Sequence, residues 1–147
     1  MKFELNISDA AMAILTNLNR FVNSLTQQMT NLGLPERSLY ITTQPLYTGR
    51  EKAICIKLEM EYQTESNRIE KCVGYHFGDN RNSDSIFLTK FTPKSLYGEA
   101  TMDDITEKDY KNRQYFDCYG IDAVTLEMID SMKAEILDFK TQVNKMK

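Results

Sequence analysis

The chain has 147 residues, of which 41% are hydrophobic and 27% are charged, as in a domain with its own core and unlike a disordered chain. Its formal net charge of −3 disfavours general binding to nucleic acid through the phosphates. No apolar run approaches the roughly 20 residues that cross a bilayer, and the first residues lack a signal-peptide pattern. Three cysteines outside CxxC spacing fit reduced thiols, so we expect a cytoplasmic protein without a membrane segment.

Apolar and polar residues alternate with a period of two in several stretches, which predicts half-buried strands. The clearest pair is 52–63 and 68–78, which the polar residues 64–67 join into a hairpin. Further strands are expected at 2–7, 38–43 and 85–91.

The register of the hairpin stays open at this point. Pairing residue 63 with 68 places His76 opposite Cys55, whereas pairing residue 62 with 65 places Cys55 opposite Cys72.

Two long helices are predicted, at about 9–32 and 122–145, because apolar residues recur there at alternating intervals of three and four. Gly33 and Pro35 end the first helix. A short helix is expected near 102–111, before an aromatic segment at 115–119. The order β-α-β-β-β-β-α indicates a single α+β domain, residues 1–147, with both long helices packed on an antiparallel sheet of four to five strands.

The apolar seams of the two long helices allow two kinds of packing. They could pack on the chain's own sheet or pair with a second copy, as heptad seams do. From the C-terminal seam, which runs almost to residue 147, we expect a homodimer through the long helices.

His76 is the only histidine, which restricts the catalytic options. We expect it on the polar, solvated face of the hairpin with Arg68 and Cys72. There it could pair with Cys55 or Cys72 in a small hydrolase or a partial metal site. An ordinary surface histidine beside two thiols is the favoured interpretation. A structural zinc site normally has four closely spaced ligands, which this sequence does not offer.

Other catalytic patterns are weak. The carboxylate pairs Glu59/Glu61 and Asp103/Asp104 fit solvated surfaces better than acid–base catalysis. The polar stretch 79–85 lacks the central glycine and distal glutamate of a calcium-binding loop, and no glycine-rich phosphate loop is present. We therefore predict a protein that is not an enzyme and that uses no metal or cofactor.

Tyrosines interleaved with acidic residues between 97 and 115 favour a recognition surface. The residues predicted to bind a partner protein are Tyr97, Asp103, Asp104, Glu107, Tyr110 and Tyr115. The predicted function is non-enzymatic binding of another macromolecule. A phage or mobile-element inhibitor of a host defence system, acting in the host cytoplasm, would fit the small acidic chain.

A small-ligand binder is the alternative. In that hypothesis Lys57, Arg68 and His76 on the polar hairpin face hold an anionic ligand of the nucleotide type. The hydrolase that uses His76 with a cysteine is the second alternative.

Overall fold

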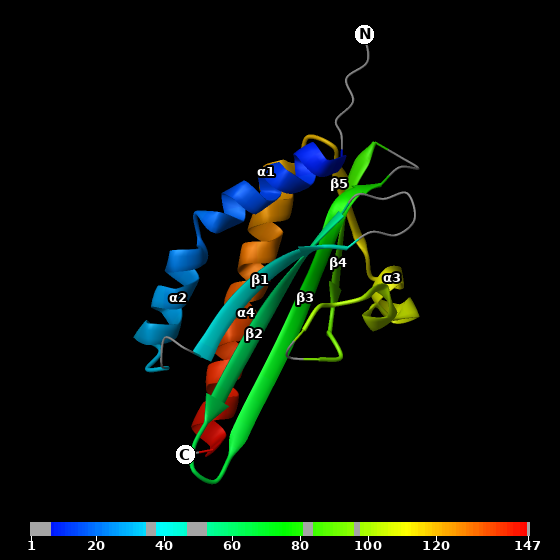
Figure 1. Ribbon diagram of the computed structural model, residues 1–147. Helices are drawn as coiled ribbons and strands as arrows, with labels where there is room; N and C mark the ends of the chain where they lie inside the picture. Colours follow the sequence, from blue (N-terminus) through cyan, green and yellow to red (C-terminus); the bar gives the residue numbers. More distant parts are fainter. Residues whose placement is uncertain (1–6, 35–37, 47–52, 81–83, 96–97, 147) are drawn as a thin grey trace.

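The computed structural model describes residues 7–34, 38–46, 53–80, 84–95 and 98–146 (Figure 1). At its centre lies one antiparallel sheet whose five strands are neighbours in chain order. The strands are β1 (Leu39–Pro45), β2 (Ala53–Gln63), β3 (Arg68–Asn80), β4 (Ser85–Phe91) and β5 (Gln114–Asp117). The predicted α+β fold with an antiparallel sheet is confirmed.

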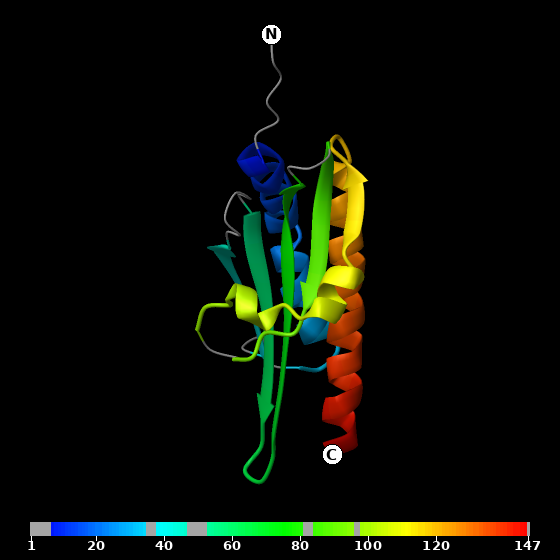
Figure 2. The ribbon, with the colours of Figure 1, turned by 90° about the vertical axis from the view of Figure 1, so that its right-hand side faces the viewer.

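Helices cover one face of the sheet and an irregular segment covers the other (Figures 1 and 2). The helix face carries α1 (Ile7–Asn19), α2 (Val22–Asn31) and the long α4 (Ile121–Met146). Residues 92–95 and 98–113, which we call the strap, lie on the opposite face and include η2 (Met102–Asp104) and α3 (Glu107–Lys111). No helix among the described residues has the length and apolar content that crossing a bilayer needs.

The main core lies between the sheet and the three helices. Every second residue of the central strands faces it, as the period of two predicts. The buried strand residues include Ile56, Leu58, Met60, Val73, Tyr75 and Phe77, and α4 adds Val124, Met128, Ile129, Met132, Ile136, Phe139 and Val143. The seam of α4 therefore packs on the chain's own sheet, and its buried residues are not available to a second copy.

The opposite face of the sheet is also buried, which corrects the expected solvated face. Leu46, Cys55 and Phe91 pack there against Ala100 and Ile105 of the strap. Polar residues are buried on the same face, among them Lys57, His76 and Thr89. Sequence alternation identifies a polar face but cannot show that a later segment covers it.

The N-terminal boundaries differ from the prediction. Of the strand expected at 2–7, residues 2–6 lie outside the described residues and Ile7 opens α1. The helix expected at 9–32 divides into α1 and α2. At the break the amides of Arg20 and Phe21 donate to the carbonyls three residues earlier, at 3.2 and 2.8 Å, which tightens the backbone into a 3₁₀-like turn.

The aromatic segment expected at 115–119 contains a strand. β5 forms because Tyr115 pairs with Phe87 and Phe116 pairs with Ile86, aromatic pairs that suit an antiparallel sheet. The helix expected at 102–111 divides into η2 and α3, each opened by a threonine capping box.

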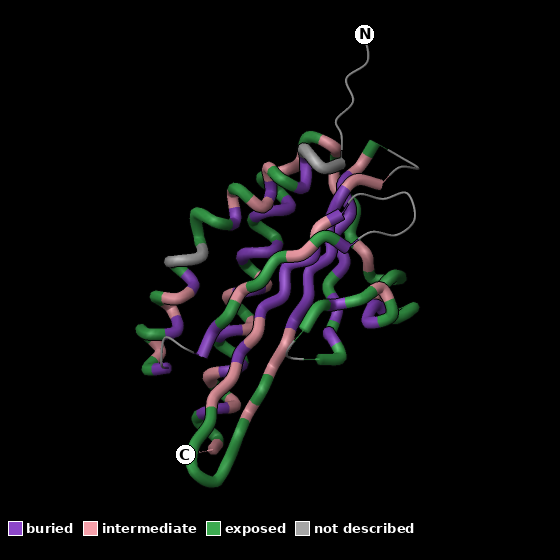
Figure 3. The backbone as a smooth tube through the Cα atoms, viewed as in Figure 1, coloured by how far each residue is buried: buried purple, intermediate pink, exposed green. Residues whose placement is uncertain are grey.

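The two central strands project beyond the rest of the sheet. The register that pairs Gln63 with Arg68 is the one observed, so His76 lies opposite Cys55. β3 has 13 residues and β4 has seven, and the last β4 pair joins Gly74 with Phe91. The beginning of β3 therefore forms an overhang, which Figure 3 shows as the more exposed end of the hairpin.

Candidate functional site

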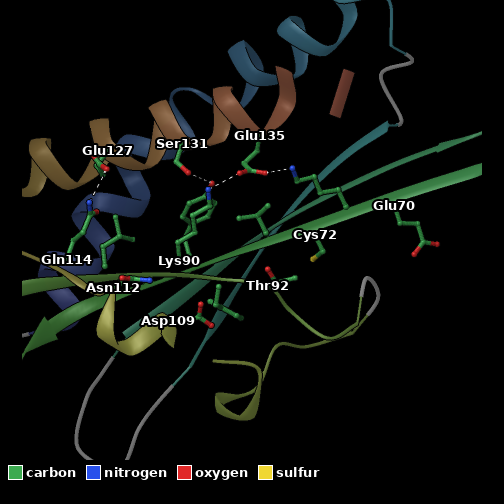
Figure 4. Close-up of a pocket in the computed structure, with 15 residues that line it drawn as sticks. Glu70, Cys72, Lys90, Thr92, Asp109, Asn112, Gln114, Glu127, Ser131 and Glu135 are labelled. Carbon is green, nitrogen blue, oxygen red and sulfur yellow. Dashed lines mark hydrogen bonds and ion pairs between the residues drawn. The ribbon is translucent and has the colours of Figure 1, made fainter. Parts of the chain in front are cut away.

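A cavity of about 750 Å³ lies where β4 ends beside β3 (Figure 4). This volume is within the range of about 300–1,000 Å³ typical of ligand sites. Its walls come from the overhang of β3, the end of β4, the strap and α4. The lining residues are Glu70, Lys71, Cys72, Val73, Tyr75, Leu88, Lys90, Phe91, Thr92, Asp109, Asn112, Gln114, Glu127, Ser131 and Glu135.

The overhang gives the cavity an unpaired strand edge. Among the described strands, residues 69–73 pair only with β2. Along one strand of an antiparallel pair, the backbone N–H and C=O groups of successive residues point alternately toward the partner strand and away from it. Counting in twos from the hairpin bond between the Thr64 amide and the Asn67 carbonyl, the backbone groups of Glu70 and Cys72 face away from β2. Such an edge is a template for one more strand.

The end of β4 is held by a contact that only glycine permits. A Cβ atom built on Gly74 would lie 2.4 Å from the ring of Phe91, its cross-strand partner. The Phe91 ring therefore occupies the space above Gly74, and it is itself almost fully buried. This contact fixes the point at which the strand edge opens.

On the α4 side of the cavity, Lys71, Lys90 and Glu135 are paired with one another. Glu135 forms an ion pair with Lys71 at 2.7 Å and accepts from Lys90 at 2.8 Å, and Lys71 also bonds Asp138. Burial opposes the charge on Glu135, but the bonds from both lysines outweigh it and lower the pKa of this carboxyl. Burial likewise opposes the charge on Lys71, but its two carboxylate partners raise the pKa of this amine.

Three uncharged polar residues, Tyr75, Ser131 and Gln114, and the carboxylate of Glu127 complete the α4 side. The hydroxyls of Tyr75 and Ser131 bond each other at 2.8 Å, and Gln114 donates to Glu127 at 3.2 Å. Burial raises the pKa of the Tyr75 phenol, so it remains protonated. Val73 and Leu88 are buried apolar residues of the cavity wall.

The strap side carries carboxylates and uncharged polar groups. Figure 4 shows Thr92, Asp109 and Asn112 on the opposite side of the strands from α4. Asp109 accepts from the Thr106 amide at 2.9 Å, and Glu70 pairs with Arg68 at 2.5 Å. Burial raises the pKa of Cys72 to about 11, so its thiol stays protonated and is a poor nucleophile at neutral pH.

His76 lies outside this cavity and is fully buried, so the expectation of a solvated histidine is wrong. Its Nε2 lies 2.9 Å from the Leu46 carbonyl, and its ring meets Phe87 edge-on at 5.0 Å. A carbonyl only accepts, so Nε2 carries the proton of the neutral ring. Burial, with a smaller contribution from Arg113, lowers the pKa of His76 to about 4. Cys55 lies opposite, and burial raises its pKa to about 12.

Lys57, Arg68 and His76 do not form one ligand site. Lys57 is 1% exposed, and its Nζ donates to the carbonyls of Ser95 and Gly98 and pairs with Glu59 at 2.9 Å. Arg68 is exposed at the other end of β3, eight residues from His76. At about 3.3 Å per residue that separation is about 26 Å. Lys57 thus holds the strap in place, while Arg68 projects from the hairpin.

The residues predicted to bind a partner protein have different environments. Asp103, Glu107, Tyr110 and Tyr115 are exposed, whereas Asp104 is buried and caps η2. Tyr97 lies outside the described residues. α3, which contains Glu107 and Tyr110, also supplies Asp109 to the cavity.

Sequence reasoning missed the cavity, but two signals pointed to it. Lys71 and Lys90 occupy positions in the apolar alternation of β3 and β4, between Ile69 and Val73 and between Leu88 and the end of the strand. A lysine at such a position needs a partner on the facing element, and Glu135 of α4 is that partner. The unequal lengths of the predicted strands also indicated an overhang.

Among the described residues, no group of three or more His, Cys, Asp or Glu side chains is arranged to hold a metal ion. No family model matches the chain, and no curated protein or solved structure matches it significantly.

Proposed function

We propose that this chain is a protein-binding module that adds an extended segment of a partner polypeptide to the edge of β3. The observation that carries the proposal is the open edge at 69–73, which lines a cavity large enough to hold side chains of the added strand. Strand addition obtains affinity from main-chain hydrogen bonds and specificity from pockets for alternate side chains. The overhang offers both.

The cavity walls support binding of a chain that enters from solvent. Glu70 and Asn112 are exposed, and Lys71 and Cys72 are partly exposed, so the edge is accessible. Tyr110, beside Asp109 on α3, is 40% exposed and extends the recognition surface beyond the cavity. Inhibition of a host system by a phage or mobile-element protein is a role that such binding would serve.

Selection from a displayed library of random nine-residue peptides tests this function. The decisive variant is Cys72→Pro, which removes an outward-facing amide while keeping the extended backbone that edge strands tolerate. Cys72→Ala is the matched control, because it removes the thiol and keeps the amide. We expect selected peptides to bind the control and to lose at least about tenfold in affinity with Cys72→Pro, the loss of roughly one main-chain hydrogen bond.

Equal binding by the two variants would overturn strand addition at this edge. Circular dichroism and thermal unfolding establish that Cys72→Pro remains folded. If it does not fold, the peptide is modified instead. Two versions are made, one with N-methyl groups on the backbone amides of its odd-numbered residues and one with them on its even-numbered residues. Only the version whose methylated amides face β3 should lose binding. Equal binding by the two methylated versions would contradict the proposal.

A further inference from the structure

Resting on the proposed function, we infer that the bound segment is basic, with lysine or arginine side chains alternating with apolar ones. An added strand points successive side chains to opposite faces of the sheet. One set would face the strap and the other would face α4. The two sides of the cavity have different chemistry, so the segment they fit has a period of two.

The strap side favours basic side chains. Its lining residues contribute two carboxylates, Glu70 and Asp109, together with Asn112, and none of the described lysines or arginines lines the cavity there. Each carboxylate has a partner, Arg68 for Glu70 and the Thr106 amide for Asp109. Two carboxylate oxygens accept about four hydrogen bonds, so both groups keep capacity for an incoming cation. An acidic side chain would meet like charge.

The α4 side favours apolar side chains. Both lysines on that side are paired with Glu135, and Tyr75 and Ser131 bond each other. Glu127, the remaining carboxylate on that side, accepts from Gln114, and Val73 and Leu88 provide an apolar surface. A charge inserted next to Val73 and Leu88 would lose hydration that these apolar side chains do not replace.

The length of the edge sets the size of the segment. Residues 69–73 span about 17 Å at about 3.3 Å per residue, which is enough to pair with about five residues of a partner. Such a segment places two or three side chains on each side of the sheet. A sequence of the form Lys-Val-Lys-Val-Lys satisfies both sides.

Fluorescence polarisation with three labelled peptides tests this inference. The probes are Ser-Lys-Val-Lys-Val-Lys-Ser, its Glu counterpart and its Gln counterpart, each capped at both ends. We expect the Lys peptide to bind at least about tenfold more tightly than the Glu peptide, a ratio that falls when salt screens the charges. Glu70→Gln with Asp109→Asn should reduce that ratio to about one. Glu65→Gln with Asp130→Asn, two exposed carboxylates that do not line the cavity, is the matched control and should leave the ratio unchanged.

The outcomes separate this inference from the proposed function. Equal binding of Lys and Glu peptides, with both sensitive to Cys72→Pro, would overturn the basic segment and leave strand addition intact. Tighter binding of the Glu peptide would also overturn it. If none of the three probes binds, the composition of the library-selected peptides tests the inference. We expect those peptides to be enriched in Lys and Arg, and a lack of enrichment would contradict the inference. Failure of the whole library would overturn the proposed function itself.

Discussion

The helix face of the sheet is buried by aliphatic and aromatic side chains, whereas the strap face is buried around Lys57, His76 and Arg113. The apolar core residues, Lys57 and His76 are almost wholly removed from water, and Arg113 is partly buried. On the helix face, stability comes from apolar area, which is non-directional and tolerant of small shifts. On the strap face it depends on a few directed bonds, such as that from Arg113 Nε to Thr89 at 2.8 Å. One sheet thus combines an aliphatic and aromatic core with a core that contains a titratable imidazole.

The partly buried charge of Arg113 is stabilised by aromatic rings on the strap face. Its guanidinium lies 4.1 Å from the centre of the Phe87 ring and 4.8 Å from that of Tyr110. Stacking on aromatic faces stabilises a weakly hydrated cation. One guanidinium nitrogen, Nη2, and His76 Nδ1 are buried without a hydrogen-bond partner in the described structure. Polar burial on this face is therefore incompletely satisfied.

The largest effect should come from the helix face. Phe139→Ala removes a fully buried ring of α4 and should lower the free energy of unfolding by about 3–5 kcal/mol. Urea titration followed by circular dichroism measures this loss. Leu137→Ala, at a position 56% exposed on the same helix, is the control and should change stability by less than about 0.5 kcal/mol. Equal effects would contradict the assignment of the main core.

Lys57→Met tests whether the strap depends on one directed cation. The variant removes the bonds to the Ser95 and Gly98 carbonyls and leaves Glu59 without its lysine, so we expect a loss of about 2–4 kcal/mol. Hydrogen exchange should accelerate in residues 98–106 more than in α4. Lys90→Met, which breaks a more exposed pair with Glu135, should cost at most about 1 kcal/mol. A loss of stability in Lys57→Met no larger than that in Lys90→Met would show that Lys57 does not hold the strap in place.

Acid should separate the two faces through His76. Its pKa is about 4 in the folded chain and about 6.5 when unfolded, so the unfolded state binds more protons between these values. Stability present above pH 6.5 is therefore lost as the pH falls to 4, by about 2–3 kcal/mol from this group. His76→Gln keeps a donor for the Leu46 carbonyl and removes the titration. Urea titrations from pH 7 to 4 should show a shallower decline for the variant, and parallel declines would exclude His76 as the cause.

Gly74→Ala should have the smallest effect of the four. The added methyl displaces the Phe91 ring, and overpacking of this kind destabilises by about 1–2 kcal/mol. The displacement should appear as changed NMR shifts in Phe91 and its neighbours on the strap face, with α4 unaffected. Gly74→Ala with Phe91→Leu provides room for the methyl and should recover part of the loss. Absence of any loss in the single variant would contradict the close packing.

The helix face was predictable from sequence and the strap face was not. Alternation in 52–63 and 68–78 and the seam of α4 identified most of the main core, because periodicity records which side of an element is apolar. The sequence pattern placed His76 and Lys57 on a solvated face because their burial depends on segments up to 41 positions away that have no regular period. Lys71 and Lys90 gave a signal for the cavity, but its position requires both the β3–β4 register and the position of Glu135. The local sequence pattern shows which face of a strand or helix is apolar, whereas the position of a binding site depends on contacts between segments that are distant in the sequence.

The contact between the first and last described helices sets an order of events during synthesis. α1 packs against α4, where Asn17 reaches Asp122 and Thr125 at 3.4 Å, and both helices pack on β2 and β3. The strands can pair with their chain neighbours as they emerge from the ribosome, since each hairpin is local. The apolar side of the sheet, however, is covered only by α1 and α2 until residues 121–146 have been translated. A nascent chain stalled before that point would expose aliphatic surface and attract chaperones, whereas release of α4 would close the core in one step.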